Sequence, residues 1–283
     1  DPLWSRGLGD VYKRQVLGFP KLEPYFVNSG KLGAVVGRYA NRISNGKAKI
    51  DGKIYSFNKN QNETHTLHGG TDGSAARNWK IIEYDKSKVK LLDELPDGHM
   101  GFPGNLTVET TYKVNKTTID IFIEASTDKT TLCNFTNHSY FNLDGAKNIA
   151  NHNLIVNCDN VLPVDKDGIP ISKPVSAKEL NLDFKNSQKL SDKGKPTEID
   201  HNFCISNIRQ NLRTNAIVSV KNISLELLST EAGLQIYTGK GLDSGNDEGW
   251  GKFPYKEFAG IALEPQTWPD SVSYTHLTLP TKA

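Results

Sequence analysis

Alternation of apolar and polar residues constrains the fold of this chain more than any other feature. Between residues 106 and 114 the apolar side chains fall at positions 106, 108, 112 and 114, and the alternation resumes from 119 to 125 after a polar turn at Asn115-Lys116. Since successive side chains of a strand point to opposite faces, this pattern predicts an antiparallel hairpin with one wet face. Similar runs recur at residues 80–92, 216–220, 223–227 and 234–238.

Turn residues separate these runs at the spacing typical of sandwiches and barrels. They include the pairs Asp51-Gly52, Pro103-Gly104, Asp167-Gly168 and Ala232-Gly233. The longest helix candidate, residues 176–180, is barely one turn and a half, and no repeat or low-complexity linker marks a domain boundary. We therefore expect an all-β fold with very little helix, formed by a single large antiparallel domain over residues 16–272.

The two ends lack this strand pattern. Residues 1–15 show no sustained strand or helix period and no apolar segment of a signal peptide. Residues 273–283 follow a strong motif but do not continue its pattern. We expect both to be non-native read-through and exclude them from the fold prediction. The natural N-terminus is then missing from this sequence, which leaves secretion open.

Composition excludes several classes of protein. The 34 Lys and Arg nearly balance the 32 Asp and Glu, so no basic surface for a nucleic acid is expected. The sequence contains no run of 18 apolar residues, so no membrane-spanning helix is expected. Three dispersed cysteines argue against a disulfide framework and against a cysteine zinc site. We expect a soluble, cytoplasmic protein that binds a small molecule or a carbohydrate.

Residues 133–143 carry an unusually polar strand pattern. A period of two places Cys133, Phe135, Phe141 and Leu143 on one face, and Asn134, Thr136, His138, Tyr140 and Asn142 on the other. Such a face lies in water or lines a polar cleft. The neighbouring large aromatic residues favour a cleft that includes His138.

Residues 260–270 place a carboxylate in a stretch with little charge. Alternation predicts that Ile261 and Leu263 are buried and that Glu264 points to the opposite face. Pro265 and Pro269 lack backbone donors, so the segment is expected at an edge of the sheet or leaving it. An edge-strand glutamate that discourages aggregation is the alternative interpretation.

Three loops and one strand position add candidates for ligand binding. Arg38, Asn41 and Arg42 follow Gly37, His68 precedes two glycines, and Asp200 stands next to His201. Gln235 faces away from its apolar neighbours in the strand pattern. Each signal alone is weak, because surface ion pairs and polar turns are commoner than catalytic groups.

Together these segments resemble the aldose 1-epimerase family. Six stretches match its motifs in type and order: GAVVGRYANRI, THTLHGG, NFTNHSYFNLDG, DHNFCI, GLQIYTGKGLD and ALEPQTWPDS. The resemblance covers residues 16–272 and implies a large antiparallel β supersandwich whose concave face binds a monosaccharide. The family extends further at both ends, so the chain as written lacks outer strands.

The resemblance also implies a role for each matching residue. Glu264 is the expected general base, His138 the general acid, and His68 an aid at the ring oxygen, while Asp200 is expected to hold sugar hydroxyls. The binding surface is completed by Asn41, Arg42, Tyr140 and Gln235. The implied substrate is an aldohexose such as galactose or glucose, and the implied role is in hexose metabolism. No metal and no other cofactor is expected, and the chain is expected to be a monomer or weak dimer.

These residue types suit anomer interconversion. Ring opening removes a proton from the C1 hydroxyl and delivers one to the ring oxygen, which a carboxylate and an imidazolium can do together. Mutual attraction should lower the pKa of Glu264 and raise the pKa of His138. Activity should then follow a bell-shaped pH profile, limited by Glu264 at low pH and by His138 at high pH.

Other functions remain open on the sequence alone. A carbohydrate-binding module could use the same sugar contacts without turnover, and polarimetry would distinguish it. A sugar-phosphate epimerase would need basic groups such as Arg38 and Arg42. A glycosidase could pair Asp200 with Glu264. A nucleotide loop at Gly239, Gly241 and Gly245, a calcium loop at residues 165–168, and glycosylation at Asn105 or Asn222 are disfavoured.

Overall fold

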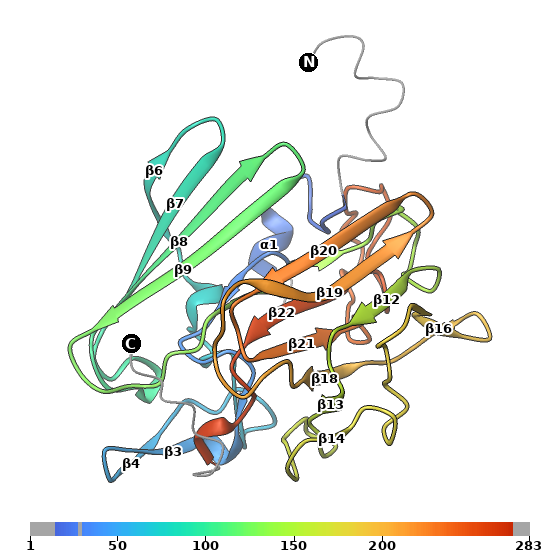
Figure 1. The fold of residues 1–283 in the computed structure, drawn as a ribbon. Coiled ribbons are helices and arrows are strands. Elements are labelled where there is room, and N and C mark those ends of the chain that lie inside the picture. The colour runs from blue at the N-terminus through green and yellow to red at the C-terminus, as the bar shows by residue number, and fades with distance from the viewer. Residues whose placement is uncertain (1–14, 28–29, 274–283) are drawn as a thin grey trace. The chain divides into compact units, whose positions relative to one another are not determined.

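The computed structural model describes residues 15–27 and 30–273 (Figure 1). The expected read-through segments lie almost entirely outside these described residues. The chain divides into two compact units, unit 1 formed by Asp1–Ala34 and Asn137–Trp268 and unit 2 by Val35–Thr136 and Pro269–Ala283. The single domain expected over residues 16–272 stays a prediction.

Strands dominate the described part of unit 1 (Figure 1). A six-stranded sheet has the order β11 (Tyr140–Phe141), β22 (Ile261–Gln266), β21 (Gly233–Tyr237), β18 (Asp200–Phe203), β13 (Asn160–Val161) and β14 (Val175–Ser176). A four-stranded sheet has the order β15 (Gln188–Lys189), β12 (Asn153–Val156), β19 (Arg213–Val220) and β20 (Ile223–Ser229). Strands β16 (Ser191–Asp192) and β17 (Lys195–Pro196) form a further pair, and α1 is short (Glu23–Val27).

Unit 2 is built around the hairpins that the alternation predicts. Its four-stranded sheet has the order β6 (Lys80–Tyr84), β7 (Lys88–Leu95), β8 (Leu106–Asn115) and β9 (Thr118–Thr127). The smaller pairs are β3 (Lys47–Ile50) with β4 (Lys53–Ser56), and β2 (Arg42–Ile43) with β5 (Thr66–Leu67). Strand β1 (Val35–Val36) begins unit 2 in the sequence, and β10 (Thr136–Asn137) contains the next point at which the chain passes from unit 2 to unit 1. Short 3₁₀ turns occupy Ser44–Gly46, Ser74–Ala76, His99–Gly101 and Ser271–Ser273.

The predicted fold class is confirmed. Every pairing in the two four-stranded sheets and in the six-stranded sheet is antiparallel over the described residues. The turn between β8 and β9 contains Lys116 with a φ of 51°. The helix candidate at residues 176–180 is wrong, because Ser176 ends β14 and a turn follows.

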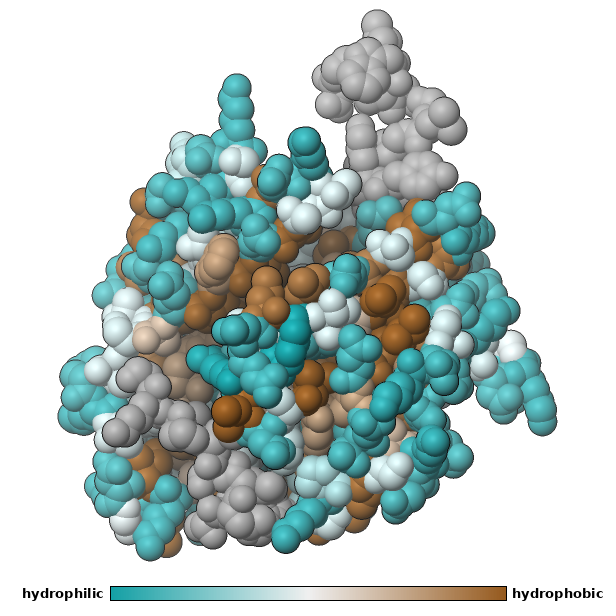
Figure 2. All heavy atoms as spheres, in the orientation of Figure 1, coloured by the Kyte–Doolittle hydropathy of each residue, from teal (hydrophilic) through white to brown (hydrophobic). Residues whose placement is uncertain are grey.

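Each unit has apolar clusters of its own. In unit 1, Leu154, Phe203, Val218, Leu234 and Ile261 belong to a cluster between the strands, and each is at most 1% exposed. In unit 2, separate clusters form around β3 and around the buried ends of β7 and β8. Figure 2 shows polar side chains over most of the displayed face, interrupted in several places by apolar ones.

The polar segment at residues 133–143 is not the single strand that its alternation predicts. It contains only the short strands β10 and β11, separated by His138 and Ser139. The alternation survives locally, because Phe141 packs against the main apolar cluster of unit 1 while Tyr140 belongs to a different cluster. No helix among the described residues is long and apolar enough to cross a membrane.

Candidate active site

One face of the six-stranded sheet carries the polar residues that the sequence singles out. The strand register places two rows on this face: Asn202, Gln235 and Glu264 in the first, and Asp200, Tyr237, Ala262 and Tyr140 in the second. Residues paired across antiparallel strands share a face of the sheet. The alternate residues Leu234, Ile236 and Leu263 lie in the apolar cluster on the other face, which confirms the parity predicted for Gln235 and Glu264.

Strand β22 accommodates its proline as expected for an edge. β11 pairs with β22 only at Ile261 and Ala262, whereas β21 continues to Gln266. Pro265 therefore lies beyond the end of β11, on the part of β22 that has one paired neighbour in the described sheet. This position avoids the loss of a ladder hydrogen bond and leaves Glu264 near the end of β11.

His138 and Glu264 meet although 125 residues of sequence separate them. The Nε2 atom of His138 lies 3.4 Å from Oε1 of Glu264. The backbone N–H of His138 donates to the carbonyl of Ala34 at 2.8 Å, and its carbonyl accepts from Gly33 at 3.2 Å. As whole residues, His138 and Glu264 are 5% and 2% exposed, so the pair is buried.

Burial sets the protonation of His138. It lowers the pKa of the imidazole to about 4, and the positive charge of Lys31 acts in the same direction, while Asp200 opposes both. The sequence predicted a raised pKa from attraction to Glu264, and this prediction is wrong. Removing an imidazolium from water costs more here than the backbone hydrogen bond and the charge of Asp200 return. His138 is therefore neutral at pH 7.

Tyr140 lies beside the pair as a neutral phenol. Its ring centroid is 5.0 Å from that of His138. Burial raises the pKa of Tyr140 well above its ordinary value, and the negative charge of Glu264 raises it further. An uncharged phenol can donate a hydrogen bond and offers an aromatic surface, both of which suit a sugar.

Asp200 and Gln235 form a polar pair on neighbouring strands of the same face. The Nε2 atom of Gln235 donates to Oδ1 of Asp200 at 2.6 Å. Gln235 is buried and is directly opposite Glu264 in the register. Unit 1 thus brings five of the predicted residues to one face: His138, Tyr140, Asp200, Gln235 and Glu264.

The other three predicted residues form a network in unit 2. The N–H of Asn41 donates to Nδ1 of His68 at 3.2 Å, and the N–H of His68 donates to the carbonyl of Asn41 at 2.9 Å. Since Nδ1 accepts, a neutral His68 carries its proton on Nε2. Oδ1 of Asn41 accepts from the N–H of Arg42 at 2.9 Å and from Nη1 of Arg42 at 3.3 Å.

Backbone strain accompanies this network. Asn41 and His68 have φ angles of 62° and 52°, in the left-handed region that few side chains adopt. Gly69 and Gly70 follow with φ angles of 83° and 101°. Strain of this kind persists where the surrounding structure enforces it, and it is concentrated at functional sites.

Arg38 does not belong with the candidate sugar contacts. Its guanidinium is buried and donates to the carbonyl oxygens of Leu95, Pro103 and Gly104 at 2.8 to 3.1 Å. These hydrogen bonds tie Arg38 to the end of β7 and to the loop before β8. Arg38 is therefore a structural residue, which removes one of the two arginines that a phosphate-binding interpretation needs.

Two weaker motifs also prove to be structural. Oδ1 of Asp165 accepts from the backbone N–H groups of Asp167 and Ile169 at 2.9 and 3.0 Å, as in an ordinary Asx turn. Gly239 has a φ of 75° in a loop that no α-helix follows within the described residues. Neither segment has the geometry of a calcium loop or a nucleotide-binding loop.

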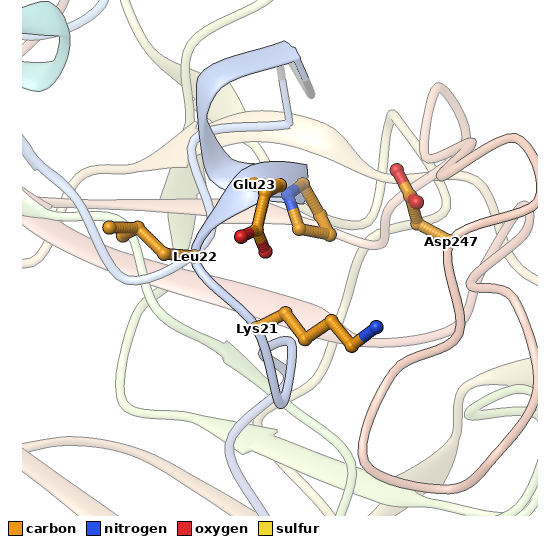
Figure 3. A pocket seen from close by; sticks show the side chains of 5 residues that line it. Lys21, Leu22, Glu23 and Asp247 are labelled. Atoms are coloured by element: carbon orange, nitrogen blue, oxygen red, sulfur yellow. The ribbon is translucent and has the colours of Figure 1, made fainter.

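A surface hollow in unit 1 lies apart from these residues. It is lined by Lys21, Leu22, Glu23, Pro24 and Asp247, with the first four at the start of α1 (Figure 3). None of the predicted site residues lines it. Lys21, Leu22 and Glu23 are exposed and Pro24 is buried, and no residue of the chemistry described above belongs to this lining.

The donor atoms of unit 1 bear on metal binding. Within unit 1, His138 offers an imidazole nitrogen and Glu264 a carboxylate oxygen, and these atoms lie 3.4 Å apart. The expectation that no metal and no other cofactor takes part stays a prediction.

Comparison with known proteins identifies the relatives of this chain. Residues 8–281 match the family model described as aldose 1-epimerase. An aldose 1-epimerase of Haemophilus influenzae is 36% identical over 276 residues, which are 92% of this chain and 78% of the relative. Galactose mutarotase of Homo sapiens is 35% identical over 91% of this chain and 76% of its own length.

The chain belongs to the aldose 1-epimerase family. It is therefore an isomerase that interconverts the anomers of an aldose, as the sequence predicted.

Solved structures of aldose epimerases agree with the fold. A GalM/aldose epimerase homologue from C. elegans superimposes with a TM-score of 0.85 at 28% identity, covering 93% of this chain and 82% of its own. Galactose 1-epimerase from Lactobacillus acidophilus superimposes with a TM-score of 0.76 at 25% identity, covering 90% and 77%.

Several neighbours of the site in this aldose 1-epimerase family member were not predicted from its sequence. Tyr237 and Asn202 share the polar face with Gln235 and Glu264, and Gln61 contacts Arg42. The period of two could have found Tyr237, which stands two residues after Gln235. No local pattern marks Gln61, because its contact depends on how two loops meet.

Proposed function

We propose that Glu264 and His138 carry the proton transfers of anomer interconversion in this chain. Glu264 removes the proton of the C1 hydroxyl, and His138 delivers a proton to the ring oxygen as the C1–O bond opens. After rotation about C1–C2 the two groups exchange roles and the ring closes. The observation that carries the proposal is the 3.4 Å approach of two buried proton carriers from distant segments.

The proposed reaction requires a fixed total number of protons on Glu264 and His138. The reaction starts with one proton on the pair and keeps that number throughout. Because burial keeps His138 neutral in the absence of sugar, its acid form has to be populated in the sugar complex. The charge of Asp200 favours this form, and the Glu264 carboxylate lies 3.4 Å from Nε2. The pH profile then reports two macroscopic values of the pair.

Asp200 and Gln235 are proposed to hold the hydroxyl groups of the sugar. Their hydrogen bond at 2.6 Å fixes both side chains on the face that carries Glu264. A carboxylate accepts from hydroxyl groups and an amide both donates and accepts, so the pair can orient a polyol. Galactose and glucose are the proposed substrates, with galactose supported by the names of several galactose mutarotases among the relatives.

The roles proposed for Asn41, Arg42 and His68 depend on the family resemblance. Their mutual hydrogen bonds in unit 2 support a joint role, since displacing one would move the others. Arg42→Ala and His68→Gln should each weaken sugar binding or turnover. A variant with unchanged kcat and KM would remove that residue from the mechanism.

We also propose a cytoplasmic location and a monomeric or weakly dimeric state. All three cysteines lie in the described residues and none forms a disulfide, which suits a reducing compartment. Cell fractionation and light scattering across a range of protein concentrations test the two proposals.

Polarimetry on freshly dissolved α-galactose and α-glucose tests the proposed function. The wild type should accelerate mutarotation, and Glu264→Gln or His138→Asn should lower kcat by about 10²–10⁴-fold with a smaller change in sugar affinity. Glu226→Gln on β20 provides a matched control, because this exposed glutamate bonds Thr214 outside the site. Near-normal turnover in Glu264→Gln would refute the role of Glu264 as base. If mutarotation with the wild type proceeded only at the uncatalysed rate, the chain would be a binding protein.

A further inference from the structure

The guanidinium of Arg42 is held by a residue outside the six family motifs. The Nε–H of Arg42 donates to Oε1 of Gln61 at 3.1 Å, while Nη1 donates to Oδ1 of Asn41 at 3.3 Å. A guanidinium presents five N–H donors in one fixed plane. Two acceptors on different atoms of that plane fix its orientation, and therefore the direction of the edge that carries the Nη atoms.

Gln61 is itself held in place by a tight turn. Its backbone N–H donates to the carbonyl of His65 at 3.1 Å, and its carbonyl accepts from the N–H groups of Thr64 and His65 at 3.0 Å. Nδ1 of His65 accepts from the N–H of Asn45 at 3.1 Å. The turn that carries Gln61 is therefore tied to the segment directly after β2, on which Arg42 lies.

The backbone of Arg42 is fixed from another direction. The N–H of Asp270 donates to the carbonyl of Arg42 at 3.1 Å, and Oδ1 of Asp270 accepts from the N–H of Ser44 at 2.8 Å. Asp270 is 1% exposed. With the backbone held in this way, the remaining freedom of Arg42 lies in its side chain, where Gln61 acts.

We propose that Gln61 is a positioning residue that orients the guanidinium of Arg42 for binding of the sugar. This inference rests on the proposed role of Arg42 as a sugar contact. Gln61 acts through Arg42, so its loss should affect the affinity for the sugar more than the proton transfers at Glu264 and His138. An acceptor oxygen at this position is the chemical requirement.

Two variants of Gln61 distinguish the effect of its acceptor oxygen from the effect of its side-chain volume. Gln61→Leu removes the acceptor and keeps a similar size, and we expect it to raise KM for galactose about five- to tenfold with kcat within about twofold. Gln61→Glu keeps an oxygen at the same distance from the backbone and should restore KM to near the wild-type value. Gln210→Leu is the matched control, because Gln210 is exposed and lies in unit 1.

A double-mutant cycle tests whether the effect passes through Arg42. In an Arg42→Ala background, Gln61→Leu should change KM no further, because the group that it positions is absent. Additive effects of the two substitutions, or an unchanged KM in Gln61→Leu, would overturn the inference. A fall in kcat equal to the rise in KM would also contradict it.

A measurement that needs no turnover separates this inference from the proposed function. The Nε–H of Arg42, followed by ¹⁵N NMR, should exchange with solvent more slowly than exposed arginines, and Gln61→Leu should remove this protection. Calorimetric titration with galactose should show the same loss of affinity as the KM values. If the wild type binds galactose without catalysing mutarotation, the proposed function fails while these two measurements still decide the role of Gln61. Equal exchange or equal affinity in both proteins refutes that role.

Discussion

Acidification from pH 7 to pH 5 should destabilise the folded chain by about 2 kcal/mol through His138 alone. The pKa of this histidine falls from 6.5 to about 4 on folding because its ring is buried. Between these two values the unfolded chain binds a proton that the folded chain does not bind. Stability therefore rises with pH in this window, and it is lost as the pH falls through 6.5 towards 4.

The magnitude follows from the two pKa values. At pH 7 both states are largely neutral at this position, and the linkage contribution is small. At pH 5 the unfolded imidazole is almost fully protonated while the folded one, with a pKa of about 4, is mostly neutral. The ratio of the two binding polynomials then corresponds to a loss of about 2 kcal/mol, a sizeable part of the stability of an ordinary domain.

Urea unfolding at the two pH values provides the assay. The free energy of unfolding should fall more in the wild type than in His138→Gln, and the difference between the two falls isolates the histidine. NMR titration of the His138 ring gives its pKa directly. An identical pH dependence in the two proteins, together with a ring pKa at or above 6.5, would refute the argument that burial outweighs the attraction of Glu264.

Three further predictions follow from single contacts. Lys31→Gln should raise the pKa of His138 in an NMR titration, because the charge of Lys31 lowers it; an unchanged or lower pKa contradicts this. Gly37→Ala should destabilise the chain by about 1–3 kcal/mol in denaturant unfolding, because its Cβ would overlap the buried ring of Phe135. Arg38→Met should cost on the order of 3 kcal/mol, since it leaves three carbonyl oxygens without their charged donor, and a loss below 1 kcal/mol would contradict that reasoning.

Strand periodicity predicted the parts of the site that lie on regular strands. Glu264 and Gln235 each stand between apolar residues, so a period of two was enough to place both on the face opposite the core. The same argument failed for residues 133–143, because His138 and Ser139 interrupt the strand pattern there. Local alternation cannot show where a chain leaves one sheet and enters another.

The two arginines of the segment 37–43 show a second limit of prediction from local sequence. Arg38 and Arg42 are four residues apart and equally plausible as ligand contacts from the sequence. Arg38 donates to carbonyl oxygens at the end of β7 and in the loop before β8, whereas Arg42 bonds Asn41 and Gln61. The difference depends on tertiary contacts between segments 19 to 66 residues apart, and no pattern in the local sequence carries it.

The low pKa of His138 was also beyond the sequence, and it has a chemical consequence for the proposed mechanism. In the open-chain intermediate the proton lies on Glu264 and His138 is neutral, which is the form that burial favours. A buried imidazolium is also a stronger acid, so it delivers its proton to the ring oxygen more readily once formed. The same burial makes that form scarcer in the free protein. In the proposed mechanism, burial therefore makes protonated His138 a stronger acid but lowers its population. Sugar binding has to supply the free energy that protonates His138.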